Sequence, residues 1–279
     1  MKVLITGGNG QLGQELQHLL NERGVTYDAA DVDVLDITDE TKVDTYFAKN
    51  RPEIVYHCAA YTAVDKAEGE GKKVNELVNA VGSEIMAKAC KKYDALMVYV
   101  STDYVFDGLR TEGEYMPDDP KGPRNEYGRT KLLGEQAIEK YCDKYYIVRT
   151  AWVYGKWGHN FVYTMLNLAK KHDRLTVVSD QIGRPTWTRT LAEFLTYLVD
   201  NNIEYGIYQC SNDGQCSWYE FAKEILKEKD VEVVPVSSDE YPTAAFRPPY
   251  SVMHLAKETG FEFLMWQDAL AEFMKQIEE

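Results

Sequence analysis

The sequence predicts an α/β protein with a doubly wound parallel sheet and a smaller lobe formed by its C-terminal half. Two observations predict this class. Short apolar runs alternate with longer amphipathic runs through the first half, which is typical of parallel strands covered by helices on both faces. The second half contains helix-like runs separated by segments rich in Gly, Pro and aromatic residues, such as 181–188 and 241–250.

The predicted elements follow from hydrophobic periodicity. The strands are Val3–Thr6, Thr26–Ala30, Ile54–Ala60, Leu96–Ser101 and Tyr146–Thr150. The helices of the first half are Gln11–Glu22, Thr41–Lys49, Val74–Lys92 and Tyr127–Tyr141. The helices of the second half are Asn160–Lys171, Thr190–Val199, Trp218–Lys229 and Trp266–Ile277. No repeat or linker separates the halves, so we expect lobes 1–150 and 151–279 to share one body, with some later helices returning to pack on the first lobe.

Composition restricts the function. The 279 residues are 44% hydrophobic and 27% charged, which excludes a disordered chain, and the formal charge of −14 argues against general nucleic-acid binding. No apolar run approaches a membrane span or a signal peptide. An odd number of cysteines without Cys-x-x-Cys spacing indicates reduced thiols, so we expect a cytoplasmic protein; they are Cys58, Cys90, Cys142, Cys210 and Cys216.

A glycine-rich turn joins the first strand to the first helix. Gly7, Gly10 and Gly13 fit G-x-x-G-x-x-G. Gly7 allows a tight turn, Gly10 lets the backbone approach a pyrophosphate, and Gly13 lets helix and strand pack closely. The helix N-terminus offers free N–H groups to phosphates. A glycine turn without a ligand is the alternative, but this position favours a Rossmann-like nucleotide site.

Acidic residues follow the second strand and bear on the choice of cofactor. Asp31 can accept hydrogen bonds from the adenosine ribose and would repel a 2′-phosphate. No Arg or Lys lies in the glycine loop or directly after the strand, so we expect NADH, with NADPH as the second choice. Asp36 and Ile37 suit an adenine pocket. A solvated surface charge is the alternative for each acid.

A possible catalytic group lies in the fourth strand and the following helix. Tyr127 and Lys131 form Y-x-x-x-K, which places both side chains on one helical face. An ammonium near a phenol lowers the phenol's pKa, which would make Tyr127 a usable proton donor for a carbonyl being reduced. Thr102 and Asp103 close the fourth strand, at the sheet edge where such folds bind ligands. A turn or helix cap is the alternative for Thr102.

Several longer blocks carry a family resemblance: GGNGQLG (7–13), AAYTAVDKAE (59–68), STDYVFDG (101–108), YGRTKLLGE (127–135), RTAWVYG (149–155), DQIGRPT (180–186) and RPPYSVM (247–253). The chain resembles the extended short-chain dehydrogenase/reductase family, and within it the dTDP-4-dehydrorhamnose reductases. The resemblance runs nearly end to end. It implies an NAD(P)-binding domain over 1–150, a substrate-binding lobe over 151–279, and hydride transfer to C4 of a 4-keto-6-deoxy nucleotide sugar.

The resemblance implies catalytic and substrate-binding roles. Tyr127 matches the proton donor, Lys131 its partner, and Thr102 the hydroxyl of the triad. Asp103 would contact the substrate, and Trp152 would pack against the sugar. Arg247 is a candidate for the nucleotide diphosphate, with a surface salt bridge as the alternative.

The resemblance also implies cofactor contacts. The implied set is Gly7, Gly10, Gln11, Leu12, Gly13, Asp31, Asp36, Ile37, Ala59, Ala60, Tyr61, Thr62, Tyr127 and Lys131. Asn79 resembles a helix asparagine of the family, with a purely structural role as the alternative.

Departures from the family pattern leave other questions open. Certain relatives pair subunits through Mg²⁺ held by glutamates, and Glu15 matches one such position. Arg189 stands where another carboxylate would lie, so we expect no metal and a monomer or weak homodimer. A 4-epimerase or dehydratase remains an alternative, although Tyr104 replaces the second acid typical of dehydratases. A regulatory subunit of the same fold is the third reading.

Overall fold

A six-stranded parallel sheet forms the centre of the protein. The structure is a computed structural model and describes residues 2–278. The strand order is β10-β5-β4-β3-β1-β2, so the chain starts in the sheet, moves to one edge and then crosses to the other. This is the doubly wound arrangement that the sequence predicts. The strands are β1 (Val3–Thr6), β2 (Tyr27–Ala30), β3 (Ile54–His57), β4 (Leu96–Thr102), β5 (Tyr145–Thr150) and β10 (Gly206–Gln209).

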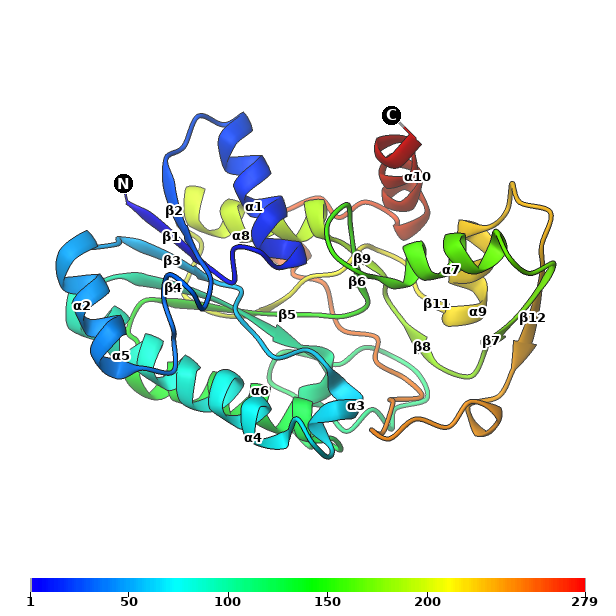
Figure 1. The fold of residues 1–279 in the computed structure, drawn as a ribbon, viewed down its shortest axis with the longest axis horizontal. Coiled ribbons are helices and arrows are strands. Elements are labelled where there is room, and N and C mark those ends of the chain that lie inside the picture. The colour runs from blue at the N-terminus through cyan, green and yellow to red at the C-terminus, as the bar shows by residue number, and fades with distance from the viewer. Residues whose placement is uncertain (1, 279) are drawn as a thin grey trace.

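Helices cover both faces of this sheet, as Figure 1 shows. On one face α1 (Gln11–Glu22) packs beside α8 (Thr188–Asp200). On the other face lie α2 (Glu40–Asn50), α5 (Ser83–Tyr93) and α6 (Glu126–Tyr141). Each face has its own apolar core, and the strand residues alternate between the two cores, for example Val98 on the α1 side and Tyr99 on the α6 side. Burial on both faces explains why the strands are almost entirely apolar.

The predicted helix 74–92 is interrupted. It consists of α4 (Lys72–Glu76), a π-helical turn η1 (Leu77–Gly82) and α5. The short helix α3 (Val64–Ala67) precedes it, and the 3₁₀ turn η2 (Asp103–Val105) follows β4. A π turn shifts the helical register by one residue and is frequent at functional sites. Here the turn carries Asn79, which contacts the loop after β3.

The second lobe contains three helices and three two-stranded pairs (Figure 1). The helices are α7 (Phe161–Ala169), α9 (Trp218–Ile225) and α10 (Trp266–Glu278). The pairs are β6 (Val153–Tyr154) with β9 (Thr186–Trp187), β8 (Ile182–Gly183) with β11 (Cys216–Ser217), and β7 (Arg174–Val178) with β12 (Glu232–Val236). Two short 3₁₀ turns complete the lobe, η3 (Ser238–Glu240) and η4 (Lys257–Thr259). Aromatic residues fill its core, including Tyr154, Phe221 and Phe273.

The structure differs from the sequence prediction mainly beyond residue 150. Strand β10 was not predicted, and it extends the central sheet from within the second half of the chain. The pair β7 and β12 was also missed, because its strands are half-exposed and short. Helix α9 ends at Ile225, earlier than the predicted Lys229. Among residues 2–278, no helix is long and apolar enough to cross a membrane.

Candidate active site

The glycine loop lies where β1 ends and α1 begins, and its glycines are required by close contacts. Gly7 has a φ of +68°, and a Cβ there would lie 2.7 Å from the Ala59 backbone. A Cβ on Gly13 would lie 2.2 Å from the Gly7 carbonyl oxygen. Gly10 is the N-cap of α1 and donates its N–H to the Gly7 carbonyl at 3.0 Å. The loop therefore keeps backbone N–H groups close to open space, as phosphate binding requires.

A pocket of about 280 Å³ opens beside this loop. It brings together the predicted cofactor residues Gly7, Gly10, Asp31, Asp36, Ile37, Ala59, Ala60 and Tyr61. The other predicted cofactor residues are not among the lining residues: Gln11, Leu12, Gly13, Thr62, Tyr127 and Lys131. The Leu12 side chain packs into the core, and the Gln11 side chain accepts a hydrogen bond from Asn160 Nδ2 at 3.0 Å. No Lys or Arg lines the pocket.

The two acids of the pocket are held in different ways. Asp31 accepts hydrogen bonds from the Asn9 N–H at 3.2 Å and the Val32 N–H at 2.8 Å, which fixes its carboxylate against the glycine loop. Asp36 accepts hydrogen bonds from the Thr38 hydroxyl at 2.6 Å and the Thr38 N–H at 3.0 Å, and these bonds lower the pKa of Asp36. Both side chains are therefore ordered parts of the pocket wall.

Asn79 holds the loop that follows β3. Its side-chain oxygen accepts the Tyr61 N–H at 2.8 Å, and its Nδ2 donates to the Tyr61 carbonyl at 3.0 Å. The side chain is fully buried and also donates to Asn75 Oδ1 at 2.8 Å. Both backbone groups of Tyr61 are thus satisfied by one amide. Asn79 positions the floor of the cofactor pocket, which is the structural role that the sequence left open.

The hydroxyl groups of Thr102 and Tyr127 meet at the end of β4. The Thr102 hydroxyl donates to Asp103 Oδ1 at 3.0 Å and accepts the Tyr104 N–H at 3.2 Å. It also lies near enough to the Tyr127 phenol to lower the pKa of that group. Asp103 is buried, and its Oδ2 has no hydrogen-bond partner in the described structure. Burial raises the pKa of Asp103 to about 6, against the hydroxyl groups of Ser251 and Thr102, which lower it. Two hydroxyls and a carboxyl that retains a free oxygen therefore face one point.

The structure corrects the expectation about Tyr127. Its pKa is raised, not lowered, because burial disfavours the phenolate and because the Asp103 carboxylate lies close by. Lys131 is absent from the groups that shift the Tyr127 pKa. The phenol is therefore neutral at physiological pH and carries the proton that a donor to a carbonyl must supply.

Lys131 is buried beneath this group. Its Nζ donates to the Val100 carbonyl at 2.7 Å and lies 3.9 Å from the centre of the Tyr99 ring. Burial lowers the pKa of Lys131 to about 7, opposed by the Glu135 carboxylate. The carbonyl and the ring face stabilise an ammonium that has lost its water.

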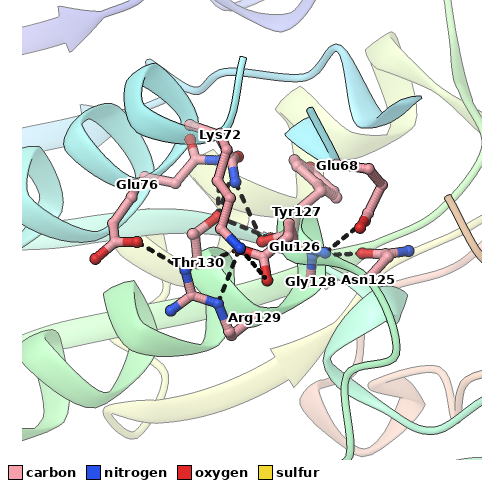
Figure 2. A network of polar contacts seen from close by, with 11 residues as sticks. Glu68, Lys72, Glu76, Asn125, Glu126, Tyr127, Gly128, Arg129 and Thr130 are labelled. Carbon is pink, nitrogen blue, oxygen red and sulfur yellow. Dashed lines mark hydrogen bonds and ion pairs between the residues drawn. The ribbon is translucent and has the colours of Figure 1, made fainter. Parts of the chain in front are cut away.

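A polar network fixes the start of α6, which carries Tyr127, as Figure 2 shows. Asn125 Oδ1 accepts the Gly128 N–H at 2.7 Å, and Glu68 Oε1 accepts the Glu126 N–H at 2.7 Å. Arg129 forms ion pairs with Glu126 at 2.9 Å and Glu76 at 2.7 Å. These contacts tie α6 to α4 and to the residues after α3, so the Tyr127 backbone is anchored from both sides. Asn125 was not predicted as a site residue, but an Asn directly before a helix is a typical N-cap, and this is the local signal that marks it.

Two of the four predicted substrate residues, Trp152 and Arg247, come from the second half of the chain. Arg247 forms an ion pair with Asp65 at 2.6 Å, while its Nη1 is buried without a hydrogen-bond partner in the described structure. Asp65 also accepts the Ala245 N–H at 3.0 Å, so it holds this segment against α3. The salt bridge that the sequence left as the alternative for Arg247 is present. Its role toward a nucleotide diphosphate stays a prediction. Asp65 lies in the AVDKAE part of the chain, but its pairing with a residue 182 positions later leaves no local signal in the sequence.

Trp152 has a left-handed backbone, with φ +49°. Its indole stacks on Trp218, with ring centroids 3.6 Å apart and planes at 11°. A left-handed conformation costs a residue with a Cβ about 1–2 kcal/mol. Packing in the surrounding lobe must therefore compensate at this position.

Glu15 and Arg189 are paired across α1 and α8. The Arg189 guanidinium lies 4.0 Å from Glu15 and 2.7 Å from both Glu22 and Glu193. Glu15 is buried, which raises its pKa, and it accepts the Thr188 hydroxyl at 3.1 Å. The positively charged Arg189 guanidinium thus lies among three glutamate side chains. No cluster of three or more metal-ligating side chains could hold a metal ion within residues 2–278.

Known proteins with similar sequences identify the family of this chain. A family model described as the RmlD substrate binding domain matches residues 1–279. The chain belongs to this family. The chain is also similar to a spore coat polysaccharide biosynthesis protein, SpsK, of Bacillus subtilis, with 42% identity over 99% of this chain and 97% of that protein.

Solved structures agree with the family assignment. The crystal structure of a dTDP-4-dehydrorhamnose reductase from Clostridium acetobutylicum has a TM-score of 0.96 and 43% identity, with all of both chains covered. A dTDP-4-dehydrorhamnose reductase from Bacillus anthracis, in complex with NADP, has a TM-score of 0.94 and 41% identity over 99% of each chain. The fold and the family that the sequence predicts are confirmed. The residue roles stay predictions.

Proposed function

We propose that this protein reduces the C4 keto group of dTDP-4-dehydro-L-rhamnose to give dTDP-L-rhamnose, using a reduced nicotinamide cofactor. The observation that carries the proposal is that α6 packs on the turn after β4, which places Tyr127 near Thr102, while the glycine loop lines a pocket on the same sheet. The RmlD family membership and the two reductase structures above support the choice of reaction and substrate.

The pocket beside the glycine loop fits a dinucleotide. A side chain at Gly7 or Gly13 would collide with backbone atoms, and the backbone at Gly10 stays open toward the pocket. The N–H groups at the start of α1 would hold the pyrophosphate, and Asp31 would accept hydrogen bonds from the ribose. When bound, the reduced nicotinamide supplies a hydride.

NADH is the preferred cofactor in this proposal, with NADPH also accepted. The Asp31 carboxylate is fixed against the loop, and no cation lines the pocket to neutralise a 2′-phosphate. The NADP complex of the Bacillus anthracis relative supports the acceptance of NADPH.

Tyr127 donates the proton to the substrate oxygen in this mechanism. The raised pKa keeps its hydroxyl protonated, and Thr102 orients that hydroxyl and hydrogen-bonds the carbonyl. Lys131 contributes a hydrogen bond to the nicotinamide ribose. Asp103, with its free Oδ2, accepts a hydroxyl of the sugar. These four side chains would form the catalytic and sugar-orienting group.

The lobe over 151–279 is the substrate lobe in this proposal, and 1–150 is the cofactor domain, to which α8 and β10 return. Trp152 packs against the sugar, and Arg247 binds the diphosphate through its unpaired Nη1, since guanidinium donors match phosphate oxygens. The five unpaired cysteines suit the reducing cytoplasm, where such a reaction would occur. We expect a monomer or weak homodimer.

The test is oxidation of NADH by the purified protein in the presence of dTDP-4-dehydro-L-rhamnose generated in situ, with NADPH in a parallel reaction. The proposal requires loss of the 340 nm absorbance of NADH together with formation of dTDP-L-rhamnose. Cofactor binding without turnover of this sugar, followed by turnover of a different ketosugar, would refute the substrate. Failure of a whole ketosugar panel would refute the activity.

A further inference from the structure

The Trp152 indole lies where three separate segments of the chain converge. The first is its own segment, between β5 and β6, in which Trp152 has φ +49° and its carbonyl accepts the Thr186 N–H at 3.1 Å. Because β6 pairs with β9, this backbone is fixed on both sides of the left-handed residue. A bulky residue with positive φ persists only where its surroundings determine it.

The second segment contributes Trp218, the first residue of α9. The two indoles are nearly parallel, with centroids 3.6 Å apart. Ser217 caps α9 in a capping box with Glu220, and Phe161 of α7 lies 4.6 Å from the Trp218 ring. Trp218 is therefore itself held from two directions and provides a rigid surface for Trp152.

The third segment contributes Gly183 in β8. A Cβ on Gly183 would lie 2.6 Å from Cε2 and 2.9 Å from Nε1 of Trp152, so only glycine leaves room for the indole. Strand β8 pairs with β11 directly before Trp218, which places both contacts on one unit. This explains the glycine of the DQIGRPT block, to which the catalytic proposal gives no role.

Trp152, Trp218 and Gly183 together form a unit that we call the clamp. The clamp adjoins the catalytic group through the backbone of Ile182. The Ile182 N–H donates to the Pro249 carbonyl at 2.9 Å, and the Ile182 carbonyl accepts the Ser251 N–H at 2.9 Å. Ser251 in turn lies near enough to Asp103 to lower the pKa of its carboxyl. The unit that holds Trp152 is thus also bonded to a segment that contacts Asp103.

We propose that Trp218 and Gly183 are positioning residues that fix the Trp152 indole in one orientation and thereby set the affinity for the sugar nucleotide. The inference rests on the proposed function, in which Trp152 packs against the sugar. An indole that is free to adopt other rotamers must be ordered when the substrate binds, and that cost weakens binding. It does not alter hydride or proton transfer once the sugar is in place.

The experiment compares Trp218→Leu, Trp218→Phe and Gly183→Ala with Trp152→Ala and the wild type. Gly69→Ala is the matched glycine control, because a Cβ there meets nothing within 4 Å. Steady-state kinetics give KM for the sugar nucleotide, KM for NADH and kcat. Near-UV circular dichroism, measured without substrate, reports the coupling of the two stacked indoles.

The clamp predicts a selective effect. Loss of one aromatic stack raises KM for the sugar nucleotide on the order of tenfold in Trp218→Leu, and less in Trp218→Phe, whose ring can still stack. Gly183→Ala raises the same KM, whereas Gly69→Ala leaves it unchanged. In all of these variants kcat and KM for NADH change less than about twofold, and both Trp218 variants lose the coupled indole signal.

Two results would overturn the clamp. One is a sugar KM near the wild-type value in Trp218→Phe and Gly183→Ala while Trp152→Ala raises it, which would leave the role of Trp152 intact. The other is a parallel loss in kcat and in both KM values, which indicates general disruption. Should Trp218→Leu fail to fold, Trp218→Phe and Gly183→Ala decide the question. An unchanged sugar KM in Trp152→Ala refutes the proposed contact and the clamp together, and a wild type without turnover refutes the proposed function itself.

Discussion

The glycine loop and the segment around Trp152 both hold the backbone in a left-handed conformation, but by different means. At Gly7, with φ +68°, the absence of a side chain permits the conformation and the close approach of Ala59. At Trp152, with φ +49°, a large side chain is held there by contacts with Trp218 and Gly183. At Gly7 the residue itself thus permits the left-handed conformation, whereas at Trp152 the conformation is held by residues that meet only in the fold.

The largest effect is expected at Tyr127, which is proposed to act where the cofactor and the substrate meet. Tyr127→Phe removes the proposed proton donor and keeps the ring that packs 6.0 Å from Tyr104. We expect kcat to fall about 10²- to 10⁴-fold, with NADH affinity unchanged. Stopped-flow binding and steady-state turnover measure the two quantities separately. Turnover near the wild-type rate would remove Tyr127 from the mechanism.

A pair of glycine variants separates left-handed strain from close contact. The pair is Gly7→Ala and Gly24→Ala. Gly7 and Gly24 have similar φ values, +68° and +65°, but only at Gly7 would a Cβ meet other atoms within 4 Å. Strain alone costs about 1–2 kcal/mol, and the overpacking at Gly7 adds about 1–3 kcal/mol. Urea unfolding measures the difference, and NADH binding should weaken only in Gly7→Ala. Equal losses of stability would show that the Ala59 contact is unimportant.

Asp103 gives a pH-dependent test on the catalytic side. Its pKa is raised from 3.8 to about 6, so the folded state binds a proton that the unfolded state has already lost. The resulting stabilisation is complete below about pH 4 and disappears as the pH rises through 6, and it amounts to at most about 3 kcal/mol.

Asp103→Asn lacks this titration. Its free energy of unfolding, measured with urea from pH 4 to pH 7, should therefore improve relative to the wild type as the pH rises. Parallel curves for the two proteins would mean that Asp103 titrates at its ordinary pKa in the fold.

Arg247 tests the substrate side alone. Arg247→Ala removes the unpaired Nη1 donor and should raise KM for the sugar nucleotide about tenfold, because a charge-assisted hydrogen bond is lost. KM for NADH should not change. Arg110→Ala is the control, since it removes an ion pair of similar length, to Asp119, at a different place. Equal KM values in the two variants would leave Arg247 as a surface salt bridge only.

The smallest expected effect is the preference for NADH over NADPH. The kcat/KM for NADH should exceed that for NADPH severalfold, because the Asp31 carboxylate repels a 2′-phosphate. Asp31→Asn should narrow the ratio, while Asp33→Asn, an exposed neighbour outside the pocket lining, should not. A wild-type preference for NADPH would reverse the assignment of Asp31.

The same contrast explains how much the sequence could predict. The bounds of the glycine loop were predicted to the residue and the end of β4 to within one residue, because a turn and a strand end depend on neighbours in sequence. Strand β10 was missed, since it is four residues long and joins the sheet only through β5. The direction of the Tyr127 pKa shift was wrong, because it depends on burial and on Asp103 and not on helical spacing. The stacking of Trp218 on Trp152 joins residues 66 positions apart in the sequence, so no local sequence pattern predicts it.

The most direct test of the whole account follows a single hydride. The protein is incubated with nicotinamide cofactor deuterated at the transferable position of its C4 and with dTDP-4-dehydro-L-rhamnose, and the product is analysed by NMR and mass spectrometry. The account predicts one deuterium, bound to C4 of the rhamnosyl ring, because hydride reaches the carbonyl carbon while Tyr127 protonates its oxygen. A product with deuterium at another carbon, or with none, would contradict it.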